Sequence, residues 1–255
     1  MSDRPTCGAP APSDSPRRYR ARLYEHYTRH DVPPATTAGF APRAPSLRAL
    51  VARHFPADRT ARILDLGCGH GALLHFAREA GFVHLAGVDG SAPQVAAARA
   101  LGIEGVREGD LLVTLRDMTE GSVDVVVAFD VVEHFTRDEV LDLVDAVLHV
   151  LRPGGRFIAH VPNGESPFHG RVLFGDATHE SAFTQRSISH LLLASGFSRV
   201  ECFEDRPTVH GLKSAVRAAL WRAIRVGLRL CLAAETGDTG SRAILTQNFL
   251  AVAYR

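Results

Sequence analysis

The sequence predicts an α/β fold, in which helices cover both faces of a doubly wound sheet of seven strands with an antiparallel last strand. Apolar runs of strand length alternate with helical patterns from about residue 60 to residue 161. The first of these runs leads directly into a glycine-rich turn, and two further apolar runs close the chain. Together these observations predict a Rossmann-like sheet, which binds its ligands at the carboxyl ends of the strands.

The chain ahead of the first strand divides into a tail and two helices. Residues 1–16 hold four prolines and few bulky side chains, so we expect a disordered tail there. Residues 17–30 are compatible with a helix whose apolar side would pack on the core. Prolines then break the chain before a second helix at about 46–55. Residues 17–255 are expected to form one domain.

Residues 63–71, with the sequence ILDLGCGHG, indicate a strand, a tight turn and the start of a helix. Gly67, Gly69 and Gly71 lie at alternate positions, where the lack of a Cβ lets the backbone turn sharply. A ligand can then lie against the peptide groups and the first turn of the helix. Asp65 lies two residues ahead of the first glycine, so the predicted cradle has a carboxylate beside it.

The same turn also satisfies the dinucleotide pattern G-x-G-x-x-G/A, so two classes of cofactor have to be compared. A dinucleotide places its pyrophosphate on the helix N-terminus, and the carboxylate of Asp65 would repel that anion. A cationic ligand, such as S-adenosylmethionine with its ammonium and sulfonium groups, suits the carboxylate better. The second strand, 83–88, ends at Asp89, where an acidic side chain would accept hydrogen bonds from the ribose of either cofactor.

Three more motifs follow in order. A short third strand precedes Glu108-Gly109-Asp110-Leu111, a fourth strand begins the run 124–134, and Leu151-Arg152-Pro153-Gly154-Gly155 precedes a fifth. In order and spacing, D-x-G-x-G-x-G, V-D, G-D-L, D-V-V-x-x-x-x-V-x-E-H and L-R-P-G-G, the chain resembles the class I S-adenosylmethionine-dependent methyltransferases. The specific motifs cover residues 60–161, and the rest of the chain resembles the family more loosely.

The resemblance implies how the cofactor is held. The methionine end would lie on the turn, formed by Asp65, Gly67, Cys68, Gly69 and Gly71. The ribose would lie at Asp89 and Gly90, the adenine at Asp110 and Leu111, and the strand tip Phe129-Asp130 under the cofactor. Members of the family place an N-terminal helix over the cofactor, so the resemblance also implies a helical lid at about 17–55. Tyr24 or Tyr27 of that lid would contact the substrate.

The last third of the chain completes the sheet. A helix from Thr184 to Ser195 precedes a sixth strand at 197–204 and a seventh at 243–254. Between these strands, about 211–236 is a helical insertion. Its helix, 212–234, is apolar with arginines at 217, 222, 225 and 229. Two interpretations remain open: the helix lies on a membrane surface as a peripheral contact, or its apolar face packs on the domain or in a dimer.

Methyl transfer from a sulfonium requires an acceptor held in line with the methyl, exclusion of water, and a base if the acceptor carries a proton. The histidines near the strand ends are the candidates for that base, His179 first and His134 second. The segment Thr178-His179-Glu180 resembles one in bacterial small-molecule methyltransferases of sugar and natural-product pathways. The substrate candidates at this rim are His160, Asn163, His169 and Glu180.

Two alternatives concern the same rim. Glu133 and His134 could simply cap the helix that follows them. Asp130, Asn163 and Glu165 could hold Mg²⁺, but carboxylates at strand tips have several other uses, so we expect no metal.

The acceptor is narrowed by the strand tip Phe129-Asp130-Val131-Val132, which lacks the N-P-P-aromatic form associated with planar amide or base nitrogens. We therefore expect methylation of an oxygen on a sugar or secondary metabolite. The alternatives are an N- or C-methyltransferase of a small metabolite, an NAD(P)-dependent oxidoreductase, and a cofactor-binding protein without turnover.

Composition limits the partners. The formal charge of +1 over 255 residues offers no electrostatic footprint for nucleic acid. The four cysteines lie far apart, which fits a reducing cytoplasm rather than a disulfide scaffold or a zinc site. No apolar stretch reaches membrane-spanning length, so we expect a cytoplasmic monomer or homodimer without stable membrane insertion.

Overall fold

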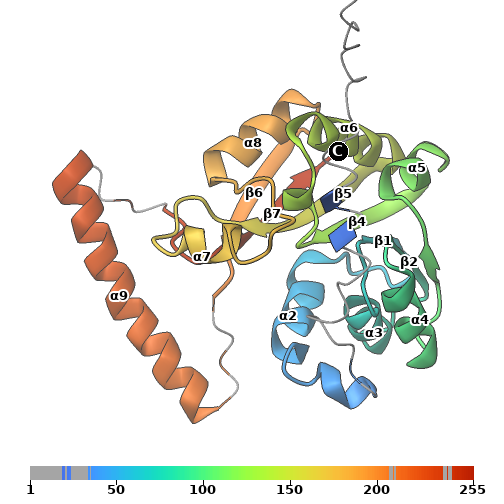
Figure 1. The fold of residues 1–255 in the computed structure, drawn as a ribbon, viewed down its shortest axis with the longest axis horizontal. Helices are drawn as coiled ribbons and strands as arrows, with labels where there is room; N and C mark the ends of the chain where they lie inside the picture. The colour runs from blue at the N-terminus through green and yellow to red at the C-terminus, as the bar shows by residue number, and fades with distance from the viewer. Residues whose placement is uncertain are drawn as a thin grey trace, which may run out of the picture.

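The structure is a computed structural model, and it describes residues 19–20, 22–23, 34, 36–206, 209, 211–237, 240 and 243–255. A seven-stranded sheet in the order β3-β2-β1-β4-β5-β7-β6 forms its centre (Figure 1). The strands are β1 (Arg62–Leu66), β2 (His84–Asp89), β3 (Val106–Glu108), β4 (Val123–Phe129), β5 (Leu151–Pro162), β6 (Arg199–Glu204) and β7 (Asn248–Tyr254). Neighbouring strands from β3 to β5 are parallel, and β7 runs antiparallel to β5 and β6. The predicted fold class is confirmed.

Helices cover the sheet in two layers. One layer holds η2 (Thr37–Phe40), α2 (Ala44–His54), α3 (Ala72–Glu79) and α4 (Ala92–Ala100). The other holds α5 (Leu111–Arg116), η3 (Val132–His134), α6 (Arg137–Val150) and α8 (Gln185–Ala194), and α7 (His169–Leu173) lies in the loop after β5. Strand β4 shows why both layers form: Val125 and Val127 pack into the first layer, and Val126 and Ala128 into the second. A strand buried on both faces is a continuous apolar run, as the sequence of β4 is.

Polar caps fix where the helices next to the site begin. Thr136 caps α6, and Glu139 closes the capping box by accepting from the Thr136 backbone N–H at 3.0 Å. The interpretation that Glu133 and His134 cap this helix is therefore wrong, because both lie in the separate turn η3. Thr184 caps α8 as expected, and the helix ends before Gly196.

The seventh strand begins at Asn248 and not at residue 243 as the sequence pattern predicted. The side chain of Asn163 explains the difference. Its Nδ2 donates to the backbone carbonyls of Ile244 at 2.7 Å and Thr246 at 2.8 Å, so these groups are bound to a side chain instead of a strand. Its Oδ1 accepts from the Glu165 N–H at 3.0 Å, and the residue is fully buried. Asn163 therefore fastens two loops together.

Asn163→Ala is expected to lower the free energy of unfolding by about 2–4 kcal/mol, because it leaves buried backbone groups without partners. Chemical denaturation measures the loss. Ser198→Ala, which removes one exposed side-chain hydrogen bond to the Tyr254 carbonyl, is the control and should cost under about 1 kcal/mol. Equal losses in the two variants would show that the hydrogen bonds of Asn163 contribute no more to stability than one exposed hydrogen bond.

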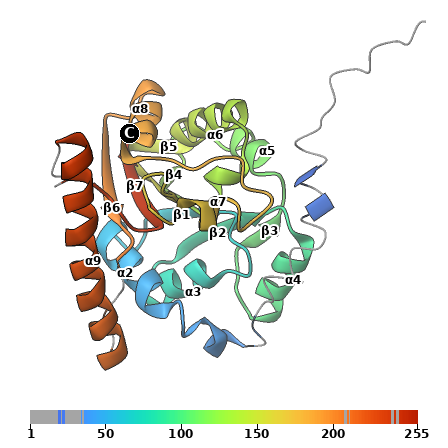
Figure 2. The same ribbon diagram turned by 60° about the vertical axis from the view of Figure 1, so that its left-hand side comes forward.

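The insertion forms α9 (Leu212–Thr236), which stands beside the body next to β6 (Figures 1 and 2). Arg225 anchors it through an ion pair with Glu204 of β6 at 3.0 Å. The interpretation that its apolar face packs on the domain fits only part of the helix, where Trp221, Leu228 and Leu232 are partly buried. Six large apolar side chains of α9 are at least half exposed: Leu212, Val216, Leu220, Ile224, Val226 and Leu230.

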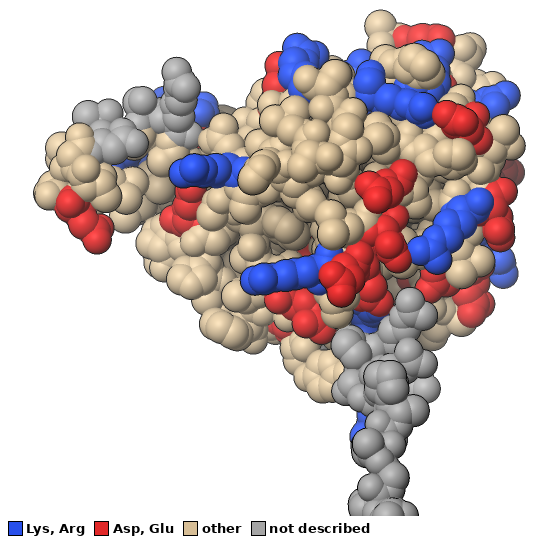
Figure 3. Space-filling model, turned by 90° about the horizontal axis from the view of Figure 1, so that it is seen from above, with Lys and Arg blue, Asp and Glu red and all other residues tan. Residues whose placement is uncertain are grey.

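The described helices and the face in Figure 3 show neither a membrane-spanning apolar helix nor a surface of a single charge. In the part of the chain that is described, no helix is both long and apolar enough to cross a membrane. The face shown in Figure 3 carries acidic and basic side chains side by side and not one continuous basic patch.

Candidate active site

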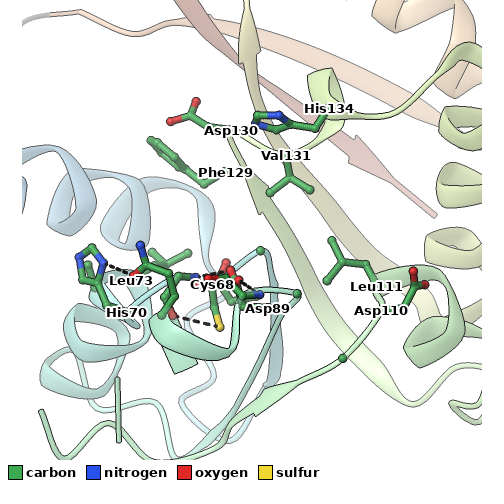
Figure 4. A pocket seen from close by; sticks show the side chains of 18 of the residues that line it. Cys68, His70, Leu73, Asp89, Asp110, Leu111, Phe129, Asp130, Val131 and His134 are labelled. Atoms are coloured by element: carbon green, nitrogen blue, oxygen red, sulfur yellow. Dashed lines mark hydrogen bonds between the residues drawn. The ribbon is translucent and has the colours of Figure 1, made fainter. Parts of the chain in front are cut away.

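A cavity of about 430 Å³ opens at the carboxyl ends of the parallel strands (Figure 4). The turn after β1 and Asp89 line one side of it, and Asp110 with Leu111 lines another. The tip of β4 and His134 complete the wall. Every residue that the resemblance assigned to the cofactor lines this cavity except Gly71. The sheet thus brings four of the five sequence motifs to one place, and only the motif at residues 151–155 lies outside the cavity wall.

The turn after β1 requires glycine for steric reasons. Gly67, Gly69 and Gly71 have φ values of 64°, 52° and 83°, a region that side chains with a Cβ rarely adopt. A Cβ on Gly67 would also collide with the side chain of Val131 at the tip of β4. Gly71 is the N-cap of α3 and shapes the turn from behind the cavity wall. The turn leaves room for a ligand against its backbone, while the N–H groups of Gly67, Gly69 and Gly71 already donate to Val88, Asp89 and Cys68.

Asp89 holds the turn in place. Its Oδ2 accepts from the Gly69 N–H at 2.7 Å, and its Oδ1 accepts from the Ser91 N–H at 2.8 Å at the start of α4. Burial raises the pKa of this carboxyl, and the two backbone hydrogen bonds oppose the shift. The acid at the end of β2 thus connects the glycine turn to the next helix before any ligand arrives.

Asp65 is the most perturbed acid of the turn. It is 2% exposed within β1, and burial, together with repulsion by Asp89, raises the pKa of its carboxyl to about 8. Arg43 on the far side of the cavity opposes this shift. A buried acid without a strong cationic partner is a site that a positive ligand would stabilise.

The tip of β4 is built on an ion pair between the buried His160 and the exposed carboxylate of Asp130. Asp130 has a φ of 57°, which is unusual for a residue other than glycine, and its Oδ1 lies 2.5 Å from His160 Nδ1. His160 Nε2 lies 3.5 Å from Asp205. Burial alone would favour a neutral ring, but the carboxylates of Asp130 and Asp205 outweigh it and raise the pKa of His160 to about 10. The ring also stacks on Phe129 with 4.0 Å between centroids.

This arrangement changes the interpretation of His160, which the sequence suggested as a substrate residue. The residue is 3% exposed and is not part of the cavity wall. With its raised pKa, His160 forms an ion pair with Asp130 and stacks on the Phe129 ring. Asp110 likewise has a structural duty, because its Oδ1 caps α5 by accepting from the Val113 N–H at 2.9 Å.

The two histidines that were candidates for the base lie together. The rings of His134 and His179 contact edge to face, with centroids 4.7 Å apart. The Glu180 N–H donates to the Glu133 carbonyl at 2.8 Å, which fastens the loop before α8 onto η3. His134 lines the cavity, and His179 stands beside it. Burial, followed by the charge of His179, lowers the pKa of His134 to about 4.

The remaining substrate candidates are not brought to the cavity. Asn163 is the buried clamp described above, and this also removes it from the proposed Mg²⁺ ligand set. His169 and Glu180 are exposed and do not line the cavity. Tyr24 and Tyr27 lie outside the described residues, so their predicted role remains a prediction.

Arg20 is among the cavity residues that the sequence patterns did not predict. It donates to Glu139 Oε1 at 2.9 Å and Oε2 at 3.2 Å, and also to the His134 carbonyl. Its guanidinium lies 5.1 Å from the centroid of the Phe135 ring. The T-x-x-E capping box that contains Glu139 is visible in the sequence. Capping alone accounts for a glutamate at this position, so the pattern gives no sign of an arginine partner. Arg20 thus connects the described part of the N-terminal segment to the cavity wall.

Arg20→Ala is expected to weaken binding of S-adenosylhomocysteine about 10-fold, because a partly buried two-pronged ion pair at the cavity wall is lost. Arg22→Ala is the matched control, since Arg22 is exposed two residues further along the same segment. Isothermal titration of both variants measures the effect. Unchanged affinity in Arg20→Ala would mean that this segment does not contribute to the ligand site.

Comparisons with known proteins agree with this geometry. A model of the family described as "Methyltransferase domain" matches residues 40–201. A ribosomal protein L11 methyltransferase from Symbiobacterium thermophilum is 33% identical over 99 residues, a match that spans 38% of this chain and only 31% of that protein.

Two solved structures are similar over most of this chain. The S-adenosylmethionine-dependent methyltransferase from Archaeoglobus fulgidus has a TM-score of 0.63 at 18% identity, covering 83% of this chain and 94% of that one. Phosphoethanolamine N-methyltransferase 2 of Haemonchus contortus, solved with S-adenosylmethionine, has a TM-score of 0.55 at 17% identity, covering 82% and 52%. At these identities the likeness concerns the fold.

Proposed function

Because this chain belongs to the methyltransferase domain family, we propose that it transfers the methyl group of S-adenosylmethionine to a hydroxyl oxygen of a small molecule, of the sugar or secondary-metabolite kind. The family match bears out the class I assignment made from the motifs and favours methyl transfer over hydride transfer. The observation that carries the proposal is the cavity. Its wall holds a buried acid, a glycine turn and His134, and His179 packs against His134.

The residues fit the cofactor by charge as well as by position. Asp65 is a buried acid whose ionised form lacks compensation, and the ammonium and sulfonium of the cofactor would supply it. Asp89 and Asp110 offer carboxylate oxygens for the ribose and the adenine amino group. A pyrophosphate would meet three acids in the same space, which is electrostatically unfavourable.

The protein contributes to the chemistry by positioning the acceptor and by keeping water away from the reacting atoms. The cofactor supplies an activated methyl, and the reaction needs the acceptor oxygen in line with it. The wall at Phe129, Val131 and Phe135 excludes water from that space. We assign activation of the acceptor hydroxyl to His179 and His134, because they are the paired imidazoles at this wall. A hydroxyl must lose its proton during the transfer, which an oriented imidazole can assist.

The acceptor class rests on the site and not on the relatives. The names of the relatives range from a ribosomal protein methyltransferase to a phosphoethanolamine N-methyltransferase, so the fold is compatible with very different acceptors. The mixed surface charge supports a small molecule over nucleic acid as the partner. Free thiols at Cys68, Cys202 and Cys231 agree with a reducing cytoplasm, and we propose a monomer or homodimer there.

Two measurements test the proposal. Isothermal titration should show binding of S-adenosylhomocysteine and not of NAD, and a donor with a labelled methyl should label small hydroxyl compounds in an acceptor panel. Binding of NAD with no binding of S-adenosylhomocysteine would overturn the cofactor assignment. Label transferred only to amines or to protein would overturn the acceptor assignment while leaving the cofactor assignment intact.

A further inference from the structure

A buried cluster beside the cavity contains three groups that bind metals in proteins. Glu133 and His134 belong to η3, and His179 belongs to the loop before α8. One donor atom of each lies within 4.8 Å of those of the other two. A four-coordinate ion with bonds of about 2.0–2.2 Å separates its ligand atoms by about 3.3 Å, so small side-chain rotations would close the set.

Each histidine is oriented from behind. His179 Nδ1 donates to the Val172 carbonyl at 3.0 Å, which leaves the lone pair of this ring on Nε2. His134 Nδ1 lies 2.8 Å from Thr178 Oγ1, and that hydroxyl donates onward to Asp176 Oδ1 at 2.6 Å. Thr178 can therefore only accept from His134, and the lone pair of this second ring is also on Nε2. Metal-binding histidines are oriented by such partners behind the ring.

Glu133 supplies the second, independent observation. It is 1% exposed, and its Oε2 has no hydrogen-bond partner among the described residues. A buried carboxylate oxygen without a partner is rare and unfavourable, and a cation beside it would satisfy both its charge and its lone pairs.

From this geometry we infer that Glu133, His134 and His179 form a binding site for a divalent transition-metal ion. Two imidazoles and one carboxylate suit ions such as Zn²⁺, Fe²⁺, Mn²⁺ or Co²⁺, whereas Mg²⁺ and Ca²⁺ prefer oxygen ligands. Three protein ligands leave at least one coordination position for another molecule. This proposal departs from the sequence-based expectation of no metal, and it differs from the Asp130, Asn163 and Glu165 set considered there.

The chemical purpose of the site rests on the proposed function. A cation here would bind the acceptor oxygen and lower its pKa, so that deprotonation needs no separate base. In the metal-loaded protein His179 is then a ligand and not a proton acceptor. Among hydroxyl compounds, the site would favour those with a second oxygen close by, which can also bind the ion.

Metal binding can be measured without any activity assay. Protein stripped with a chelator and dialysed against Co²⁺ should take up one ion per chain, by elemental analysis, and show the visible absorption of a site with nitrogen ligands. Glu133→Gln and His179→Ala should each weaken Co²⁺ binding at least 10-fold. Thr178→Val, which removes the orientation of His134, should weaken it about 10-fold.

The control is His75→Ala, because His75 and Glu79 form a histidine–carboxylate pair on the surface, 3.4 Å apart. That variant should retain the wild-type affinity for Co²⁺. Glu133→Gln keeps the shape of the side chain, and circular dichroism verifies that each variant folds. Stoichiometric Co²⁺ retained by both Glu133→Gln and His179→Ala, or no uptake by the wild type, would overturn the site. Binding of S-adenosylhomocysteine to the stripped protein separately reports whether the proposed function holds.

A different observation, the outward face of α9, carries a second inference. The six exposed apolar residues described above follow one side of the helix, and three exposed basic residues flank them: Lys213 and Arg217 along one edge and Arg222 along the other. The whole helix has five basic residues and one acidic residue, Glu235. An apolar stripe with basic flanks complements a lipid layer, whose acyl chains are apolar and whose headgroups can be anionic.

We propose that this face of α9 rests on an anionic lipid surface. A second copy of the chain would bring the same basic flanks against each other, with one acid per helix to offset them. On a membrane the apolar side chains enter the headgroup boundary, and the arginine and lysine stems reach the phosphates. The Arg225–Glu204 ion pair attaches this helix to the sheet, so the bound domain would lie at the membrane surface.

Sedimentation with vesicles tests this. The full chain should bind vesicles that contain one-fifth phosphatidylglycerol in phosphatidylcholine and bind pure phosphatidylcholine at least 10-fold more weakly. Leu220→Glu and Arg217→Glu should each reduce binding at least several-fold. Leu193→Glu on α8, which changes an exposed leucine elsewhere, should not. Equal binding to both vesicles, or a dimer in light scattering that Leu220→Glu dissociates, would overturn the proposal.

Discussion

Asp65→Asn is expected to weaken binding of S-adenosylmethionine at least about 30-fold, since removing one partner of a buried charge pair costs about 2–5 kcal/mol or more. Asparagine has the same shape as aspartate, so the cavity keeps its form and only the charge is lost. Isothermal titration of the two proteins measures the difference. The effect should be smaller for S-adenosylhomocysteine, which lacks the sulfonium charge.

The pH dependence gives this prediction a sharper form. In the ligand-free protein the pKa of Asp65 is raised to about 8, and a cationic ligand favours the ionised form. Affinity of the wild type should therefore rise as the pH increases towards about 8 and level off above it, with protons released on binding. Titrations in buffers of different ionisation enthalpy detect that release. The asparagine variant should show neither the slope nor the release.

The same substitution should stabilise the ligand-free fold. Because the folded pKa of Asp65 lies above its ordinary value of 3.8, the unfolded chain ionises first, and stability falls as the pH rises from about 4 to about 8. The asparagine variant lacks this loss, so its advantage in melting temperature should grow over that range. Asp145→Asn, an exposed carboxylate on α6, is the control. If Asp65→Asn bound the donor with the affinity of the wild type, the proposed attraction between Asp65 and the cationic donor would be contradicted.

His179→Ala is expected to lower turnover about 100-fold or more while leaving the affinity for the donor unchanged. The reason is geometric, because His179 packs against His134 and does not line the cavity, whereas the glycine turn proposed to hold the cofactor does. Single-turnover rates and donor titrations measure the two quantities separately. The decrease is expected whether the ring takes the proton directly or holds an ion that does the work.

His190→Ala on the exposed side of α8 is the matched control and should keep its activity. Added imidazole should restore part of the turnover of His179→Ala, because the small ring can enter the space that the side chain leaves. Full activity in His179→Ala would transfer the role to His134.

The sequence predicted the fold well because its strongest signals are local. Strands buried on both faces, the glycine turn and the helix caps each follow from neighbouring residues, and the parallel order follows from the alternation of strands and helices. Where a side chain from a distant segment intervened, the prediction was wrong. Asn163 binds the carbonyls of Ile244 and Thr246, about 80 residues away in the chain, and thereby delays the last strand.

The candidate site divides along the same line. Motif spacing predicted which residues would line one cavity, since four of the motifs follow strand ends that meet at one edge of the sheet. Spacing could not show that His160 is enclosed by Asp130 and Asp205, or that Arg20 meets Glu139. It also could not show that His134 and His179 share a cluster with Glu133, because residues on two separate loops approach only after folding. Charge partners across long separations leave no periodic trace in a sequence.

The attachment of Arg20 to Glu139 has a kinetic consequence. Since this arginine forms part of the cavity wall, a ligand that passes on that side has to wait until the ion pair opens. For a spent donor that leaves on that side, we expect the residence time to shorten when salt screens the pair. The enzyme would thus be subject to strong inhibition by its own by-product at low ionic strength and to faster cycling at high ionic strength.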